Sequence, residues 1–124
     1  MARILIAEDE EALCALCARA LMSEGHEVVT AADGSEALDV LTREEGRFDL
    51  LLTDIRMPVM DGIALSLAAA RDFSQLTILL MTGYADQRER AHGLDAIIRD
   101  VITKPFTVAT LRDAVNVALT VKAG

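Results

Sequence analysis

The sequence of 124 residues is short of positive charge and has no long apolar run. Twelve Lys and Arg stand against twenty Asp and Glu, which leaves a formal net charge of −8. The basic residues do not gather into a stripe that could follow a phosphate backbone, so we expect no direct binding to nucleic acid. No apolar run approaches the roughly 20 residues that span a bilayer, and the first residues lead at once into a strand-like run instead of a signal peptide. The sequence therefore predicts a cytoplasmic protein without membrane contact.

Cysteine is scarce as well. Cys14 and Cys17 are the two cysteines, and their spacing can indicate a redox pair or half of a zinc site. They fall inside a segment of helical periodicity, with no further cysteine to complete a zinc site and no histidine close by in sequence. We expect Cys17 to pack inward as a small hydrophobic residue and Cys14 to lie near the surface, without a disulfide.

Linkers, low-complexity segments and internal repeats are missing too. A chain of this length suits one compact domain that buries roughly two-thirds of the surface of its unfolded form. We therefore expect residues 1–124 to form a single domain, with no output domain attached.

Short apolar runs alternate with longer segments of helical periodicity along the whole chain. The expected strands cover 3–7, 26–31, 48–53, 77–81 and part of 97–103, and the expected helices cover 11–24, 35–43, 63–71, 86–92 and 108–121. Such alternation predicts a parallel sheet with helices on both faces, because parallel strands need crossover connections. We predict a three-layer, doubly wound (βα)5 α/β fold with the flavodoxin-like strand order 2-1-3-4-5.

The first expected helix has a clear apolar face. Apolar side chains recur at the spacing of one helix face, and we expect this stripe to point into the core: Leu13, Leu16, Cys17, Ala20 and Leu21.

Carboxylates follow two strands that this topology makes neighbours. Glu8 and Asp9 come directly after the first strand, and Asp54 follows the third. In the predicted order these strands flank the point where the order reverses, which is where open α/β sheets bind ligands. Three carboxylates at one place repel one another, and a divalent cation relieves that repulsion. Mg²⁺ suits the site because it binds a few carboxylates and keeps waters as its other ligands.

A hydroxyl and an ammonium follow the fourth and fifth strands at the same edge. Thr82 ends the fourth strand and Lys104 ends the fifth. Each residue alone has an ordinary explanation, since an Asp after a strand often caps a helix and a Lys before Pro often lies in a solvated turn. Together, the residues can neutralise the oxygens of a phosphoryl group during its transfer to a carboxylate.

The strings that contain these residues resemble the receiver domain of two-component response regulators over the whole chain. They are Glu8-Asp9, the segment 52–62 (LTDIRMPVMDG), Met81-Thr82-Gly83 and Thr103-Lys104-Pro105-Phe106. The resemblance implies that Asp54 takes a phosphoryl group from a phosphohistidine on a sensor kinase or a phosphotransfer protein. It also implies that Mg²⁺ is held by Glu8, Asp9, Asp54 and the backbone carbonyl of Arg56, and that Thr82 and Lys104 contact the phosphoryl group.

Further properties follow from the same resemblance. The peptide bond between Lys104 and Pro105 is expected to be cis, which is uncommon for bonds before proline in general. Such a domain is a signalling module that gains and loses its own phosphoryl group, not a conventional enzyme. It is expected to be a monomer or a weak dimer.

The sequence departs from the family pattern at Val101. Many receivers have Tyr or Phe at this position, three residues before the lysine, and that ring moves inward when the threonine moves toward the phosphoryl group. Tyr84, the only tyrosine, could replace it as a sensor or could simply cover the site. Arg56 and Tyr84 also occupy the two positions that tune the access of the hydrolytic water in this family.

Partner surfaces are expected on two sides of the domain. The outward face of the first helix has small or apolar side chains and, by resemblance, would dock the histidine-bearing partner: Cys14, Ala15, Ala18 and Met22. Leu67, Ala68 and Ala70 give the third helix a similar outer face. The face formed by the fourth helix, the fifth strand and the fifth helix would bind an effector. The domain could act as a phosphorelay intermediate or as an adaptor, and its residues 82–85 with Val101 are similar to those of receivers that serve as protease adaptors.

A second class of function uses some of the same chemistry. Mg²⁺-dependent phosphatases of the haloacid dehalogenase type also have an Asp nucleophile and a Lys. They need a second Asp two residues after the nucleophile, where this chain has Arg56. The sequence therefore favours the receiver.

Overall fold

The computed structural model describes residues 2–83, 89–91 and 93–123. Within these residues one parallel sheet has the strand order β2-β1-β3-β4-β5. The strands are β1 (Arg3–Ala7), β2 (Glu27–Ala31), β3 (Leu50–Asp54), β4 (Thr77–Thr82) and β5 (Asp100–Thr103). The helices are α1 (Glu11–Met22), α2 (Gly34–Arg43), α3 (Gly62–Asp72) and α5 (Val108–Ala123). The predicted doubly wound fold and its strand order are confirmed.

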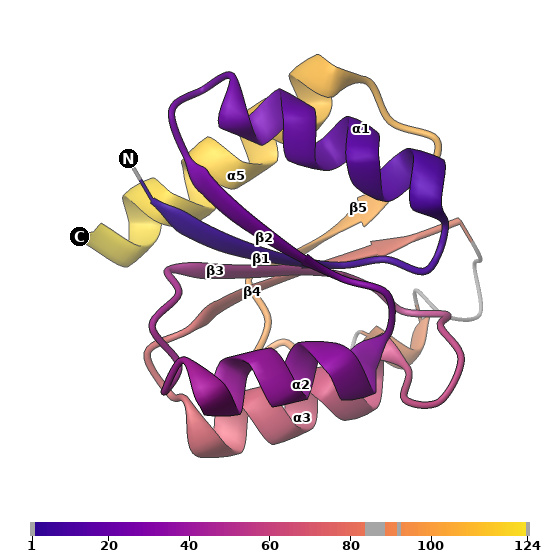
Figure 1. The fold of residues 1–124 in the computed structure, drawn as a ribbon, viewed down its shortest axis with the longest axis vertical. Coiled ribbons are helices and arrows are strands. Elements are labelled where there is room, and N and C mark those ends of the chain that lie inside the picture. The colour runs from indigo at the N-terminus through magenta and orange to yellow at the C-terminus, as the bar shows by residue number, and fades with distance from the viewer. Residues whose placement is uncertain (1, 84–88, 92, 124) are drawn as a thin grey trace.

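The helices cover the two faces of the sheet in pairs. Figure 1 shows α1 and α5 on one face and α2 and α3 on the other. Of the expected fourth helix, residues 89–91 are helical, and the rest of the expected range includes residues outside those described. Among the described residues, no helix is both long and apolar enough to cross a membrane.

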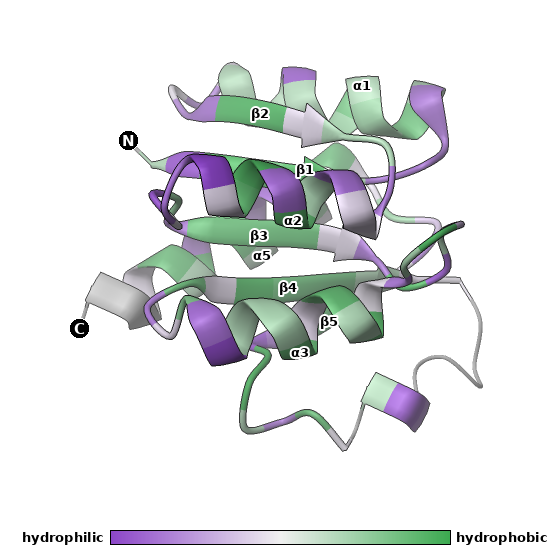
Figure 2. Cartoon of the chain, turned by 60° about the horizontal axis from the view of Figure 1, so that its bottom comes forward, coloured by the Kyte–Doolittle hydropathy of each residue, from purple (hydrophilic) through white to green (hydrophobic). Residues whose placement is uncertain are grey.

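Two hydrophobic cores lie between these layers, because successive strand side chains point to opposite faces. Leu51 and Leu80 pack with residues of α2 and α3, whereas Leu50, Leu52 and Leu79 pack with residues of α1 and α5. All five residues of β3 are buried, and β3 and β4 are hydrophobic over most of their length in Figure 2. A strand buried on both faces reads as an apolar run, which is the pattern of the three leucines 50–52 within the expected strand 48–53.

The first helix is turned away from its predicted orientation. Cys17, Ala20 and Leu21 are buried as expected, but Leu16 is 46% exposed. Ala18, which the sequence placed on the outer face, is buried at 9% exposure in the core that α5 helps to form. Those two expectations were wrong because the periodicity of one helix defines a face against the sheet, whereas α1 also packs against α5. Cys14 is partly buried and both thiols are free.

The loop between β3 and α3 is fixed by two close approaches of backbone. A Cβ atom on Gly62 would lie 2.1 Å from the backbone oxygen of Asp54, and one on Gly34 would lie 2.4 Å from the backbone oxygen of Met60. Only glycine fits at such distances. The Gly62 N–H donates to the carbonyl of Ile55 at 2.7 Å, and the Gly34 N–H donates to that of Met60 at 3.1 Å. The start of α3 is thereby held against the end of β3.

Candidate functional site

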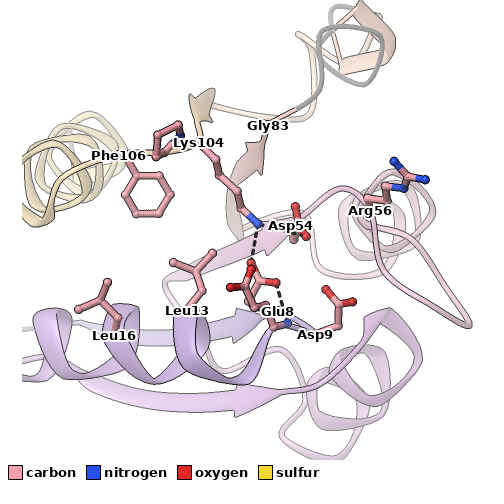
Figure 3. A pocket seen from close by; sticks show the side chains of 11 residues that line it. Glu8, Asp9, Leu13, Leu16, Asp54, Arg56, Gly83, Lys104 and Phe106 are labelled. Carbon is pink, nitrogen blue, oxygen red and sulfur yellow. Dashed lines mark hydrogen bonds and ion pairs between the residues drawn. The ribbon is translucent and has the colours of Figure 1, made fainter.

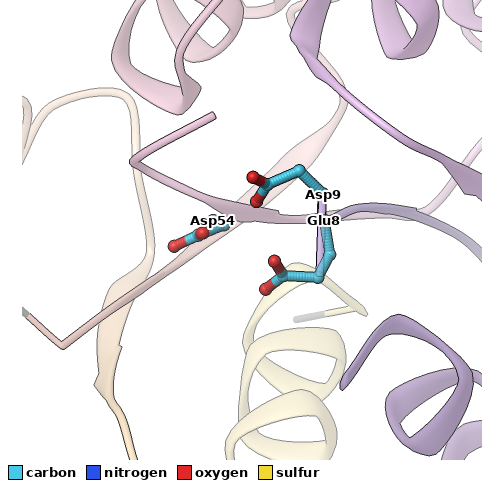
Figure 4. A group of neighbouring side chains, drawn as sticks. All are labelled: Glu8, Asp9 and Asp54. Atoms are coloured by element: carbon cyan, nitrogen blue, oxygen red, sulfur yellow. The ribbon is translucent and has the colours of Figure 1, made fainter. Parts of the chain in front are cut away.

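Three carboxylates converge where β1 and β3 end. Each of Glu8, Asp9 and Asp54 offers an oxygen, and these oxygens all lie within 4.8 Å of one another (Figure 4). The two strands are neighbours, with Ala7 paired to Thr53, so the residues that follow Ala7 meet the residue that ends β3. Glu8 and Asp54 are buried, whereas Asp9 is exposed. The structure therefore brings together the three acidic residues singled out from the sequence.

Lys104 reaches this cluster from the end of β5. Its Nζ lies 2.9 Å from Oε1 of Glu8 and 3.3 Å from Oδ2 of Asp54 (Figure 3). The Lys104 N–H donates to the carbonyl of Thr82 at 2.8 Å, which places the start of the lysine side chain beside the end of β4. The other carboxylate oxygen of Glu8 accepts from the N–H of Glu10 at 3.0 Å. Glu8 therefore uses one oxygen to hold the lysine and the other to fix its own position.

The electrostatics of the site are set by burial and by an excess of negative charge. Burial raises the pKa of Asp54, with the Asp9 charge adding to the rise and the Lys104 ammonium opposing it. Burial also raises the pKa of Glu8, against the hydrogen bond from Lys104. Burial alone would lower the pKa of Lys104, but the hydrogen bond to Glu8 and the charge of Asp54 raise it above its ordinary value. One ammonium thus faces more carboxylate charge than it can neutralise.

This donor set fits Mg²⁺. The cluster supplies only carboxylate oxygens, which are ligands of hard cations, and Asp9 is open to solvent so that waters can complete an octahedron. Burial raises the pKa of both carboxyls, and a bound cation would offset this by stabilising their charged forms. Asp9 and Asp54 would hold the ion directly, and Glu8 adjoins them while bonded to Lys104.

The cluster lies at one side of an open cavity of about 840 Å³. The acidic residues and Lys104 form its polar part, and Arg56 and Gly83 line it from the ends of β3 and β4. An apolar wall adjoins them, made by Leu13 and Leu16 of α1 and Phe106 before α5, and Figure 3 shows these three side chains grouped beside the lysine. The sequence patterns assigned Leu13 and Leu16 to the core and gave Phe106 no separate role. In the sequence, this wall could have been found from the position of Phe106, which directly follows Lys104-Pro105.

The other predicted residues fall at different depths. Thr82 is the last residue of β4 and is 1% exposed. Arg56 has an exposed side chain. Val101 is half-buried, pairs in register with Leu80 and packs against the core below α2 and α3. Tyr84 lies outside the described residues, so its expected role stays a prediction.

The helix caps argue against an ordinary structural role for the clustered aspartates. Asp33 caps α2 through the N–H of Glu36, and Asp61 caps α3 through the N–H of Ala64. The residue at the cap position of α1 is Glu10, which makes no side-chain cap bond. Asp54 is itself the last residue of β3. The peptide bond between Lys104 and Pro105 is cis, as the resemblance implied.

Comparisons with known proteins agree with this arrangement. The sequence model of the response regulator receiver domain matches residues 4–116. The transcriptional regulatory protein TcrA of Mycobacterium tuberculosis is 37% identical over 109 residues, which are 88% of this chain and 42% of TcrA. The chain thus spans less than half the length of TcrA, and 44% of the transcriptional regulatory protein CpxR of Escherichia coli, to which it is 36% identical over 106 residues, 86% of its own length.

Solved structures agree as well. A response regulator receiver domain protein from Clostridium thermocellum superposes with a TM-score of 0.90 at 25% identity, over 99% of this chain and 98% of that one. The response regulator TrrA from Thermotoga maritima, solved in complex with Mg²⁺-BeF, superposes with a TM-score of 0.83 at 29% identity, over 95% of this chain and 99% of that one.

Proposed function

The chain belongs to the response regulator receiver family, and from this we propose that it accepts a phosphoryl group on Asp54 from a phosphohistidine of a sensor kinase or a phosphotransfer protein. One observation carries the proposal: a single ammonium, that of Lys104, contacts the buried Glu8 and Asp54 carboxylates, with Asp9 beside them. The proposal is supported by the cavity of about 840 Å³ that these side chains line, since a donor side chain can approach Asp54 and Lys104 through it.

The reaction is an in-line displacement at phosphorus. A carboxylate oxygen of Asp54 forms a new bond to phosphorus while the bond from phosphorus to the donor imidazole nitrogen breaks, and the imidazole leaves with that electron pair. The Lys104 ammonium, already within contact of both buried carboxylates, stabilises the negative charge spread over the transferred group. We propose that the hydroxyl of Thr82, at the end of the neighbouring strand β4, contacts the oxygens of the same phosphoryl group.

Mg²⁺ would be held by Asp9 and Asp54, with Glu8 and the Arg56 backbone carbonyl contributing to its shell. When bound, it supplies charge neutralisation that lets the donor phosphoryl group approach the carboxylates. Arg56, which lines the cavity, is assigned to the control of hydrolytic water. Hydrolysis of the acyl phosphate returns Asp54 to its free carboxylate, so the protein is a signalling module and not an enzyme that turns over a separate substrate.

The assignment of Asp54 is tested with a small-molecule donor. Wild type incubated with acetyl phosphate and Mg²⁺ should gain one phosphoryl group, measured by intact-protein mass spectrometry, and Asp54→Ala should gain none. Asp39→Ala is the matched control, because Asp39 is exposed on α2. Stable phosphorylation of Asp54→Ala would show that the acceptor is a different residue.

We assign docking of the histidine-bearing partner to the surface beside the site. Leu16 is exposed and lines the same cavity as the acidic cluster, and Ala15 and Met22 are also exposed on α1. Ala18 is removed from this surface because it is buried. An apolar contact next to the reacting groups would orient the donor imidazole toward Asp54.

A charged residue in this wall should separate docking from chemistry. Leu16→Glu should slow transfer from a phosphorylated histidine phosphotransfer protein by roughly tenfold or more, because a charge would be desolvated in the contact. Its reaction with acetyl phosphate should be unchanged. Val117→Glu, at a 60% exposed position of α5, serves as the control. Equal loss with both donors would place Leu16 in the chemistry instead of the docking.

We propose that the output surface lies at the edge of the sheet formed by β5. We assign effector binding to the face that includes β5 and α5, and we propose a cytoplasmic receiver, monomeric or weakly dimeric, that acts as a relay or an adaptor. The runner-up, a phosphatase of the haloacid dehalogenase type, has no acid at the required position because Arg56 stands there. Release of phosphate from p-nitrophenyl phosphate by wild type but not by Asp54→Ala would favour that alternative.

A further inference from the structure

We propose that the ion pair between Asp61 and Arg90 links the chemical state of Asp54 to the helical segment 89–91. The inference rests on the proposed function, because it concerns how phosphorylation of Asp54 would be felt elsewhere in the domain. Ala91 of this segment lies in the same hydrophobic core as the half-buried Val101 of β5.

The first link is between Asp54 and the start of α3. The Gly62 N–H donates to the carbonyl of Ile55 at 2.7 Å, and the Gly62 Cα lies so close to the backbone of Asp54 that a Cβ would fall 2.1 Å from its oxygen. The Ile55 N–H donates to the carbonyl of Met81 in β4 at 3.1 Å. Close-packed backbone transmits displacement with little slack. A shift of the Asp54 main chain therefore moves the residues at the start of α3.

The second link is Asp61, whose carboxylate makes two contacts at once. Oδ1 accepts from the N–H of Ala64 at 2.8 Å and so caps α3. Oδ2 accepts from Nη2 of Arg90 at 3.2 Å. Next to Arg90, Ala91 is fully buried in the core under α2 and α3. The segment 89–91 is thus held to the domain by an apolar contact and by a charged contact, and the charged contact ends on the cap of the helix that follows Asp54.

Lys104 marks the unphosphorylated arrangement of the site. In this structure its Nζ lies 3.3 Å from Oδ2 of Asp54, in direct contact. A phosphoryl group bonded to Oδ2 would occupy the space between that oxygen and the ammonium, so the direct contact belongs to the unphosphorylated arrangement. The proposal assigns the Asp61–Arg90 pair to this same unphosphorylated arrangement. A contact made in only one of two arrangements stabilises that one, so removal of the pair should strengthen binding of a phosphoryl mimic.

The expected size is small because both side chains are partly exposed, at 32% for Asp61 and 47% for Arg90. Exposed pairs of this kind change an equilibrium by about two- to fivefold. Calorimetry suits the measurement, since the chain has no tryptophan to report binding by fluorescence.

The experiment is a titration with beryllium fluoride in the presence of Mg²⁺. Three variants are compared with wild type: Asp61→Asn, Arg90→Gln and the double variant. Asparagine caps helices as well as aspartate does, so Asp61→Asn removes the charge and keeps the cap. Arg71→Gln is the control, because Arg71 makes a similar exposed ion pair with Asp72 on α3. Thermal unfolding checks that all variants fold.

Each single variant should bind beryllium fluoride about two- to fivefold more tightly than wild type, and the double variant should bind no more tightly than the singles. A general electrostatic effect on an anion would act in opposite directions, because one substitution removes a negative charge and the other a positive one. Unchanged or weaker binding in either single variant, or an equal gain in Arg71→Gln, overturns the inference. Wild type that binds no beryllium fluoride overturns the proposed function and this inference with it.

Discussion

The two ends of the sheet each hold a cation between two carboxylates, but in different surroundings. At the carboxyl end, Lys104 lies between Glu8 and Asp54, whose side chains are 0% and 9% exposed. At the amino end, Arg3 lies between Glu27 and Glu44, whose side chains are 63% and 43% exposed. The difference shows that ion pairing alone does not indicate a functional site. What distinguishes the carboxyl end is buried negative charge that its cation does not fully neutralise.

The amino-end cluster of Arg3, Glu27 and Glu44 has a structural role. Arg3 bonds to Glu27 of β2 and to Glu44 directly after α2, and it donates to the carbonyl of Arg47 at 2.9 Å. Its guanidinium also lies 4.3 Å from the centre of the Phe48 ring. The hydrogen bonds to both glutamates raise the pKa of Arg3. Every contact joins chain segments that must meet for the sheet to form, and the cluster lies at the end opposite to the cavity.

The strongest test of the difference between the two ends of the sheet is to remove the cation of each cluster in turn. Lys104→Met should lower the rate of phosphorylation by acetyl phosphate by about 100-fold, because a preorganised charge at the transferred group is lost. Arg3→Met should leave that rate unchanged. The rates are measured with Mg²⁺ present by gel mobility or mass spectrometry. A similar loss in both variants would mean that the lysine acts through stability and not through the reaction.

At the amino end of the sheet, loss of the cation should change the stability of the protein instead of its reaction rate. Arg3→Met should lower the free energy of unfolding by about 1–2 kcal/mol, from two exposed ion pairs and one cation–π contact. Urea denaturation measures the change, and about 0.5 M NaCl should reduce it because exposed charges are screened. A salt-independent loss would instead indicate that the packing of the arginine stem matters more than its charge.

Removing buried charge should stabilise the carboxyl end. Because the pKa of Asp54 is raised in the folded protein, the folded state binds more protons than the unfolded state and loses stability as the pH rises through that pKa. Asp54→Asn escapes this loss and should be more stable than wild type by about 1 kcal/mol at pH 7, at the expense of function. Urea denaturation in EDTA should show the difference shrinking as the pH falls toward 4. A difference that grows toward acid pH would mean that Asp54 is stabilised as a carboxylate by Lys104.

Much of the molecule could be predicted from the order of its apolar and polar residues. The expected strand 48–53 centres on three consecutive leucines, 50–52, because both faces of β3 are covered, and β1 was predicted with its observed bounds, Arg3–Ala7. The acidic cluster followed from topology, because parallel strands that are neighbours end at the same edge. The orientation of α1 did not follow, since its second contact, with α5, involves residues almost 100 positions away.

The sequence by itself determined which chemistry is available here: carboxylates, a hydroxyl and an ammonium after successive strands, within a chain whose alternation requires a parallel sheet. The tertiary structure decided how deeply these groups are buried, which way they point and what they contact. It buried Glu8 and Asp54 while leaving Asp9 exposed, turned Leu16 outward beside the site, and joined Asp61 to Arg90. Burial, and with it the pKa of a carboxyl, depends on every segment that packs around a group, and local sequence does not record those segments.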